Sequence, residues 1–171
     1  MHCQITNPRI LQGMKDQDLL AYIQPVFIDL DMNTVEPAIG AQRMDKVYAW
    51  KSMLDMGIHT SGGSDAPVVS FDAMENIYFA VTRKNISGQP QEGWIPSEKI
   101  SVDEAVKLFT KNAAYASYTE DENGTIEVGK NADFVVLEKN IYDIDPDEIK
   151  ATKVDMTVLG GEIVYEREVE E

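Results

Sequence analysis

Asp65, which directly follows a short predicted strand, is the residue of this chain best placed to carry chemistry. It closes the Gly/Ser-rich turn 62–64 and is followed by Pro67. In a β/α barrel a carboxylate at the carboxyl end of a strand points into the active site. An aspartate there can bind a divalent metal and accept a proton from metal-bound water. The alternative is that Asp65 only accepts hydrogen bonds from the amides of its own turn.

The chain has two histidines, and spacing alone does not join either of them to Asp65. His59 lies six residues before Asp65, so both side chains fall on one face of the predicted strand. An extended strand would still separate them by about 20 Å. We therefore expect His59 to be a packing residue. Taken alone, His2 is expected to be an exposed histidine at the start of the chain.

Three other motifs resemble ligand sites but lack essential residues. The segment 124–130 spells G-x-x-x-x-G-K, yet Asn131 follows where a phosphate loop needs Ser or Thr, and a strand pattern follows instead of a helix. The acidic segments 29–33 and 143–147 lack the glycine and the final glutamate of a calcium loop. We interpret the first as a β-turn and the other two as solvated acidic loops.

The hydrophobic pattern before residue 123 alternates strands with helices, which is typical of an α/β fold. A capping box formed by Ser101 and Glu104 marks the start of the last helix in this part. A loop without periodicity spans 84–100. The pattern predicts helices over 16–23, 40–56, 70–81 and 101–117, and strands over 24–28 and 58–62.

After residue 122 the pattern becomes mostly β. The continuous apolar run 134–137 predicts a buried strand. Alternating apolar residues before and after Gly160-Gly161 predict a hairpin, because the two-residue turns of hairpins need positive φ angles. Residues 166–171 form an acidic tail, which we expect to fray.

Length and composition narrow the range of functions. The chain has 171 residues, of which 43% are hydrophobic, so it can form one domain or one domain with a small annex. Its formal net charge of −15 argues against a nucleic-acid partner and against an anionic membrane. A single cysteine allows no internal disulfide, and residues 1–9 lack a signal-peptide core. The expected location is therefore the cytoplasm.

Residues 57–68 closely resemble the last barrel strand of the metal-dependent amidohydrolases, in amidohydrolase family 3 and its N-substituted formamide deformylase-like branch. The segments His2-Cys3-Gln4 and Gln24-Pro25 look like the sixth and seventh barrel strands of that family. The resemblance covers nearly the whole chain and continues through residues 80–83, 93–96, 101–116, 124–137 and 158–165.

This resemblance implies an α/β fold with two parts. Residues 1–122 would be the C-terminal part of a TIM-type (β/α)8 barrel, about strands 6–8, and residues 123–171 would be part of a small β-sandwich domain. Asp65 resembles the family's metal-binding, proton-accepting aspartate, and His2 resembles its metal-binding histidine. The implied cofactor is a divalent metal, with zinc as the default and iron or manganese left open. The implied reaction is hydrolysis of a C–N bond in a small-molecule amide or formamide by metal-activated water.

The chain also departs from the family pattern. A complete barrel needs about 250 residues. The first-strand His-x-His, the mid-barrel lysine or carboxylate and the fifth-strand histidine have no counterpart, and Met1 stands where the family has a glutamate. Because His2 and Asp65 fall short of the three ligands of a catalytic zinc site, we expect this chain alone to be inactive.

Two further expectations concern partners and the loop 84–100. A cut barrel leaves strand edges uncovered, so we expect self-association or pairing with a missing N-terminal half. The alternative function is a catalytically dead, stand-alone α/β assembly or binding module. Within the loop, Trp94 is either an apolar wall of a substrate site or a packing residue of the loop itself.

Overall fold

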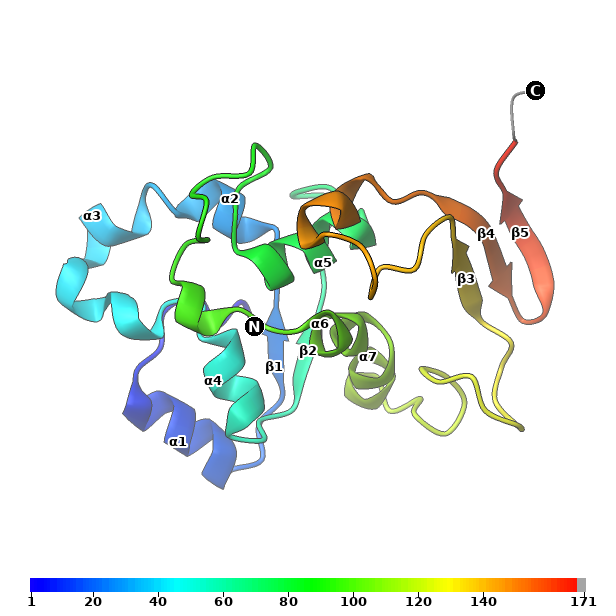
Figure 1. Cartoon of the computed structure of the whole chain (residues 1–171). Helices are drawn as coiled ribbons and strands as arrows, with labels where there is room; N and C mark the ends of the chain where they lie inside the picture. Colours follow the sequence, from blue (N-terminus) through cyan, green and yellow to red (C-terminus); the bar gives the residue numbers. More distant parts are fainter. Residues whose placement is uncertain (169–171) are drawn as a thin grey trace.

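The computed structural model describes residues 1–168. Helices surround a parallel pair of strands, and a three-stranded antiparallel sheet lies to one side of them (Figure 1). No helix in this described part is long and apolar enough to cross a membrane. The elements are α1 (Pro8–Asp16), β1 (Ala21–Ile23), α2 (Phe27–Asp31), α3 (Val35–Ile39), η1 (Ala41–Lys46), α4 (Trp50–Asp55), β2 (Thr60–Gly62), α5 (Ala73–Thr82), η2 (Pro96–Glu98), α6 (Val102–Phe109), α7 (Lys111–Ala116), β3 (Phe134–Leu137), η3 (Pro146–Ala151), β4 (Val154–Leu159) and β5 (Glu162–Glu166).

β1 and β2 pair in parallel, with Ala21 opposite Thr60 and Ile23 opposite Gly62. Their carboxyl ends therefore meet at one edge, where the Gly63 amide donates to the Ile23 carbonyl (3.0 Å). A side chain at Gly62 would place its Cβ 2.7 Å from the Phe109 ring, so glycine lets α6 pack directly on β2. This packing fixes the start of the segment that carries Asp65.

Arg83 links three segments of the helical part. Its backbone ends α5 in the left-handed conformation (φ 54°), and its side chain is fully buried. Nη1 donates to the Tyr48 carbonyl (2.9 Å), Nε donates to the Trp94 carbonyl (2.6 Å), and the guanidinium lies 4.7 Å from the Trp50 ring centroid. Burial lowers the pKa of Arg83 to about 10, so it stays charged at neutral pH. The loop after α5 is thereby fastened to the segment before α4.

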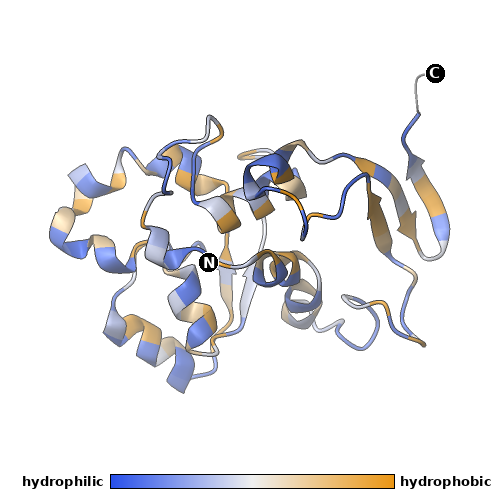
Figure 2. Ribbon diagram, viewed as in Figure 1, coloured by the Kyte–Doolittle hydropathy of each residue, from blue (hydrophilic) through white to orange (hydrophobic). Residues whose placement is uncertain are grey.

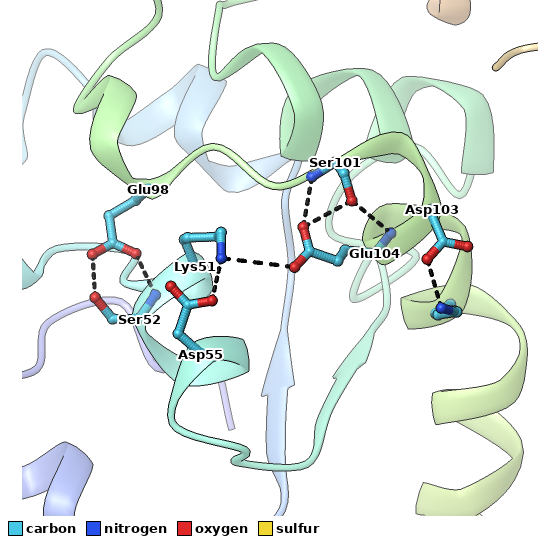
Figure 3. Close-up of polar contacts among 8 residues, drawn as sticks. Lys51, Ser52, Asp55, Glu98, Ser101, Asp103 and Glu104 are labelled. Carbon is cyan, nitrogen blue, oxygen red and sulfur yellow. Dashed lines mark hydrogen bonds and ion pairs between the residues drawn. The ribbon is translucent and has the colours of Figure 1, made fainter.

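The first turn of α4 receives its cap from a distant element. Ala49, at the N-cap position, has no side chain that can bind the free amides. Instead, buried Glu98 of η2 accepts hydrogen bonds from the Ser52 amide (2.9 Å) and hydroxyl (2.5 Å), as Figure 3 shows. Lys46 Nζ lies 3.6 Å from the same carboxylate. Glu98 therefore performs the role that a local N-cap residue usually performs.

Several predicted elements are confirmed. The capping box of Ser101 and Glu104 is present at the start of α6 (Figure 3), and the predicted strand 58–62 contains β2. The hairpin turns at Gly160 and Gly161, whose φ angles are 58° and 84°. The α/β class is likewise confirmed. The capping box and the hairpin turn depend on contacts between residues that are close in sequence.

The predictions for residues 16–28 are wrong. A helix was expected over 16–23, but α1 ends at Asp16, and residues 21–23 form β1. The expected strand 24–28 is instead a turn followed by α2. The physical reason is the pairing with β2, which selects the alternation of buried Ala21, exposed Tyr22 and buried Ile23 over a helical stripe.

The long helices expected over 40–56 and 101–117 are each interrupted. Tyr48 has a φ of 50° and its amide donates to the Gln4 carbonyl (2.8 Å), which separates η1 from α4. Thr110 (φ −124°, ψ −99°) separates α6 from α7. The helix expected from residue 70 begins instead at Ala73, because the carboxylate of Asp72, the N-cap residue, accepts from the amides of Met74 and Glu75. Such breaks depend on tertiary contacts that periodicity does not report.

The C-terminal sheet has the order β3-β4-β5 and is apolar on both faces. β3 was expected to be buried, but the prediction is wrong: Phe134, Val135 and Val136 are 37%, 52% and 42% exposed. Figure 2 shows hydrophobic residues along these strands. The exposure arises because no element among residues 1–168 covers the sheet fully. Of the expected acidic tail, Glu166 belongs to β5, and residues 169–171 lie outside the described residues.

Candidate active site

Asp65 lies in the turn that leaves the carboxyl end of β2. It is exposed and adopts a φ of 64°, a conformation that aspartate tolerates better than most residues. The amide of Ala66 bonds to the Ser64 hydroxyl (3.3 Å), and the amide of Val68 bonds to the Asp65 main-chain carbonyl (2.9 Å). Within residues 1–168 the Asp65 carboxylate thus accepts no turn amide. It remains available to a ligand.

His2 lies at the carboxyl end of β1. Its Nδ1 is 2.8 Å from Oε1 of Gln24, the residue that directly follows β1. Its ring also stacks on Phe27, with ring centroids 5.7 Å apart. Since β1 and β2 are parallel neighbours, His2 and Asp65 lie at the same edge of the strand pair. The structure therefore brings to one edge two residues from distant parts of the sequence.

The N-terminal segment does not form the strand that the resemblance suggested. His2 and Cys3 have φ angles of 65° and 51°, and Ile5 makes an isolated antiparallel bridge to Val47. The reason is that this segment bonds to residues 46–48 instead of to the free edge of β1. His2 still reaches the carboxyl end of β1 through its side chain.

A small polar cluster holds the N-terminal segment in this position. The Tyr48 hydroxyl donates to Asp31 Oδ2 (2.5 Å), and Gln4 Nε2 donates both to Asp31 Oδ2 (2.9 Å) and to the Tyr48 hydroxyl (2.9 Å). Burial, followed by the bond to Asp31, raises the pKa of Tyr48 well above its usual range. The phenol therefore stays protonated, and the cluster anchors the chain two residues from His2.

The side chains at this edge supply only part of the ligand set that a divalent metal needs. An imidazole nitrogen and a carboxylate oxygen are ligands that zinc binds in proteins. The part of the chain that the structure describes contains no group of three or more His, Cys, Asp or Glu side chains able to hold a metal ion. His2 and Asp65 thus fit two coordination positions, one fewer than a catalytic zinc site normally takes from protein.

The other candidates have structural roles. His59 stacks on Tyr115 (4.3 Å between centroids), and its carbonyl accepts from Ala21 at the amino end of β1, away from Asp65. Half-buried Trp94 packs on Tyr48 (5.6 Å), which favours the packing alternative for this residue.

Residues of the phosphate-loop-like segment 124–130 and of the acidic segment 29–33 make structural hydrogen bonds. Lys130 donates to the Glu120 carbonyl (2.6 Å) and the Thr125 hydroxyl (2.7 Å), so it closes its own loop. Asp29 accepts from the Ile86 amide (2.7 Å), and Asp31 belongs to the cluster with Tyr48.

Sequence reasoning did not identify Gln24 as a site residue. The pair Gln24-Pro25 entered only as part of a strand resemblance, and no local pattern joins it to His2. Its role follows from the contact alone.

Two adjoining cavities, of about 720 and 530 Å³, lie between α6 and β3 and share Val106, Phe109 and Phe134 in their walls. Neither cavity is lined by His2, Gln24 or Asp65. They are therefore separate from the edge described above.

The sequence profile of the Amidohydrolase family matches residues 1–165. The chain belongs to the Amidohydrolase family. It is 34% identical over 167 residues to YtcJ of Bacillus subtilis strain 168; the match covers 98% of this chain and 32% of YtcJ. It is 36% identical over 122 residues to the N-substituted formamide deformylase of Arthrobacter pascens, covering 71% of this chain and 22% of the deformylase.

Solved structures agree with this family membership at the level of fold. An uncharacterized metal-dependent hydrolase from Pyrococcus horikoshii OT3 superposes with a TM-score of 0.75 at 19% identity, over 85% of this chain and 29% of that one. An amidohydrolase from Thermotoga maritima MSB8 gives a TM-score of 0.65 at 19% identity, over 93% and 34%. This amidohydrolase-family chain spans about a third of the length of YtcJ and less of the deformylase.

Proposed function

We propose that this chain carries the C-terminal part of the catalytic barrel of a metal-dependent hydrolase that cleaves the C–N bond of a small-molecule amide or formamide. The observation that carries the proposal is the placement of His2 and Asp65 at the carboxyl edge of β1 and β2. Barrel enzymes of this type build their active sites at that edge. The similarity to an N-substituted formamide deformylase supports the amide or formamide class.

In this proposal β1 and β2 correspond to barrel strands seven and eight, and the segment around His2 corresponds to strand six. Residues 1–122 then belong to the barrel, and residues 123–171 belong to the small β-domain. The change from a parallel pair to an antiparallel sheet supports this division.

The chemistry assigns a role to each residue at the edge. His2 and Asp65 would hold a divalent metal, zinc by donor type, which when bound supplies Lewis acidity and a more acidic water. As water adds to the carbonyl carbon, Asp65 accepts its proton and passes it to the amine nitrogen when the C–N bond breaks. The products are a carboxylic acid and an amine. Because two ligands are too few, the remaining ligands must come from outside residues 1–168, and this chain alone is expected to be inactive.

A chimera tests the proposed function. The segment of the A. pascens deformylase that matches this chain would be replaced by the corresponding residues of this chain, and hydrolysis of an N-substituted formamide would be measured. We expect the chimera to deformylate the substrate measurably. In Asp65→Asn the rate should fall by about 10²–10⁴-fold, the contribution typical of a general base. Asp45→Asn, which changes an exposed aspartate of η1, serves as the control. An Asp65→Asn chimera as active as its parent would overturn the proposal.

Metal binding by the chain itself is a separate prediction. We expect weak zinc binding, no amide turnover, and a zinc affinity at least about tenfold lower in Asp65→Asn, because one of two ligands is lost. Isothermal titration and elemental analysis measure the affinity and the stoichiometry. Unchanged affinity in Asp65→Asn would show that this carboxylate is not a ligand, and turnover by the chain alone would refute its expected inactivity.

We also propose that a second copy of the chain covers the C-terminal sheet. Seven large apolar side chains on its strands are each exposed by more than a third: Phe134, Val135, Val136, Leu159, Ile163, Val164 and Tyr165. These side chains are distributed over both faces of the sheet. Soluble monomers rarely leave large apolar patches open, and a standard interface needs about 800 Å² from each partner. The alternative is that a further segment of a longer polypeptide covers the sheet. In that case, a polypeptide that includes the segment would not self-associate.

Charged substitutions on one face of the sheet test this association. Val135 and Tyr165 lie in one cross-strand row through Thr157. We expect the wild-type chain to dimerise or form larger species at tens of micromolar, and Val135→Lys/Tyr165→Lys to weaken association at least tenfold in sedimentation velocity experiments. Ile10→Lys on exposed α1 should leave it unchanged. A monodisperse, cooperatively unfolding wild-type monomer would contradict this prediction.

A further inference from the structure

The contact between His2 and Gln24 bears on which ring nitrogen of His2 carries the proton. His2 Nδ1 lies 2.8 Å from Gln24 Oε1, and an amide oxygen only accepts hydrogen bonds. With the Gln24 amide in this orientation, Nδ1 is the donor of the bond and carries the ring proton. A neutral imidazole has a single ring proton, so Nε2 is left with its lone pair free.

Both partners in this contact are held by the same turn. Gln24 is only 7% exposed, and its carbonyl accepts from the Phe27 amide (3.1 Å). The Val26 amide donates to Asn76 Oδ1 (3.2 Å), which fastens the turn to α5. Phe27 in turn stacks on the His2 ring. The backbone that carries Gln24 is thus held in place by the turn and by α5, and its side chain is buried.

We infer that Gln24 is a positioning residue that keeps His2 in its Nδ1–H tautomer and so presents Nε2 as the ligand atom at the carboxyl edge of β1 and β2. Metal-binding histidines commonly donate their other ring N–H to an oxygen acceptor, which fixes the tautomer and the ring orientation. The identity of the ligand as a divalent metal rests on the proposed function, whereas the tautomer itself does not.

The tautomer can be observed directly because the chain has two histidines. We would record two-bond ¹H–¹⁵N spectra of the imidazoles at pH 9, where an ordinary imidazole is neutral. The wild-type spectrum should show a protonated Nδ1 and a bare Nε2 for His2. His59, which stacks on Tyr115 and lies beside the amino end of β1, is the internal reference. A wild-type His2 protonated at Nε2 would overturn the inference.

Two substitutions separate positioning from ordinary packing. Gln24→Glu keeps an oxygen acceptor at the same distance from the main chain, so the Nδ1–H tautomer should persist. Gln24→Leu removes the acceptor while keeping a similar volume, so both His2 nitrogen shifts should move toward averaged values. Unaltered His59 resonances and circular dichroism verify that each variant folds. A Gln24→Leu spectrum identical to that of the wild type would contradict the positioning role of Gln24. If Gln24→Leu does not fold, the test is Gln24→Glu: loss of the Nδ1–H tautomer in that variant would contradict the role.

Zinc titration, followed through the His2 resonances, tests the ligand. Loss of such a supporting contact typically weakens metal binding by about 10–100-fold, which we expect for Gln24→Leu and not for Gln24→Glu. Equal zinc affinity in wild type and Gln24→Leu would overturn the positioning role. The expected tautomer without any zinc shift at His2 would support the inference about Gln24 and count against the proposed metal-binding function.

Discussion

Arg83→Ala is expected to lower the free energy of unfolding by about 3–5 kcal/mol, the largest effect that we predict for one side chain. The substitution leaves the Trp94 carbonyl without its Arg83 donor and leaves the Tyr48 carbonyl with the Trp50 amide (2.8 Å) in place of two donors, and it opens a cavity beside Trp50. A loss of this size is a large share of the stability of a typical domain. Chemical denaturation followed by circular dichroism measures it.

Two comparisons make the Arg83 prediction specific. Arg83→Lys keeps the charge, but an ammonium group lacks the planar set of donors that reaches both carbonyls, so we expect an intermediate loss of about 2 kcal/mol. Arg43→Ala removes an exposed arginine of η1 and should change stability by no more than about 0.5 kcal/mol. If Arg83→Ala behaved like Arg43→Ala, the buried guanidinium would not be holding these segments together.

Glu98→Ala is expected to cost about 2–3 kcal/mol, the second largest effect. The substitution leaves the amide of Ser52 without a partner in the first turn of α4, where no local side chain can replace the carboxylate. It also removes the acceptor of the Ser52 hydroxyl and the charge facing Lys46. Thermal and urea unfolding would both record this loss.

A conservative variant and a matched control accompany the Glu98 measurement. Glu98→Gln keeps one oxygen acceptor at this position, so it should cost only about 1 kcal/mol. Glu92→Ala changes an exposed glutamate of the same loop and should have an effect within about 0.5 kcal/mol. Equal losses for Glu98→Ala and Glu92→Ala would show that Glu98 does not cap α4.

The candidate site was predictable only in part. Asp65 could be singled out because a Gly/Ser-rich turn after a short strand is a local pattern. His2 entered through family resemblance, and its contact with Gln24 follows from no spacing rule. The helix break at Tyr48, which anchors the segment carrying His2, was likewise invisible to periodicity. Placing these residues requires knowing which distant segments touch.

Features that depend on neighbours a few residues apart could be predicted from local patterns. The capping box joins residues three apart, and the β4–β5 hairpin needs only a two-residue glycine turn between alternating strands. Other features became visible only once the chain was folded: residues 21–23 form a strand, Glu98 caps α4, Arg83 binds the Tyr48 carbonyl, and β3 lies exposed. The reason is that strand pairing, burial and non-local capping draw their free energy from segments far apart in the chain, about which local propensity carries no information.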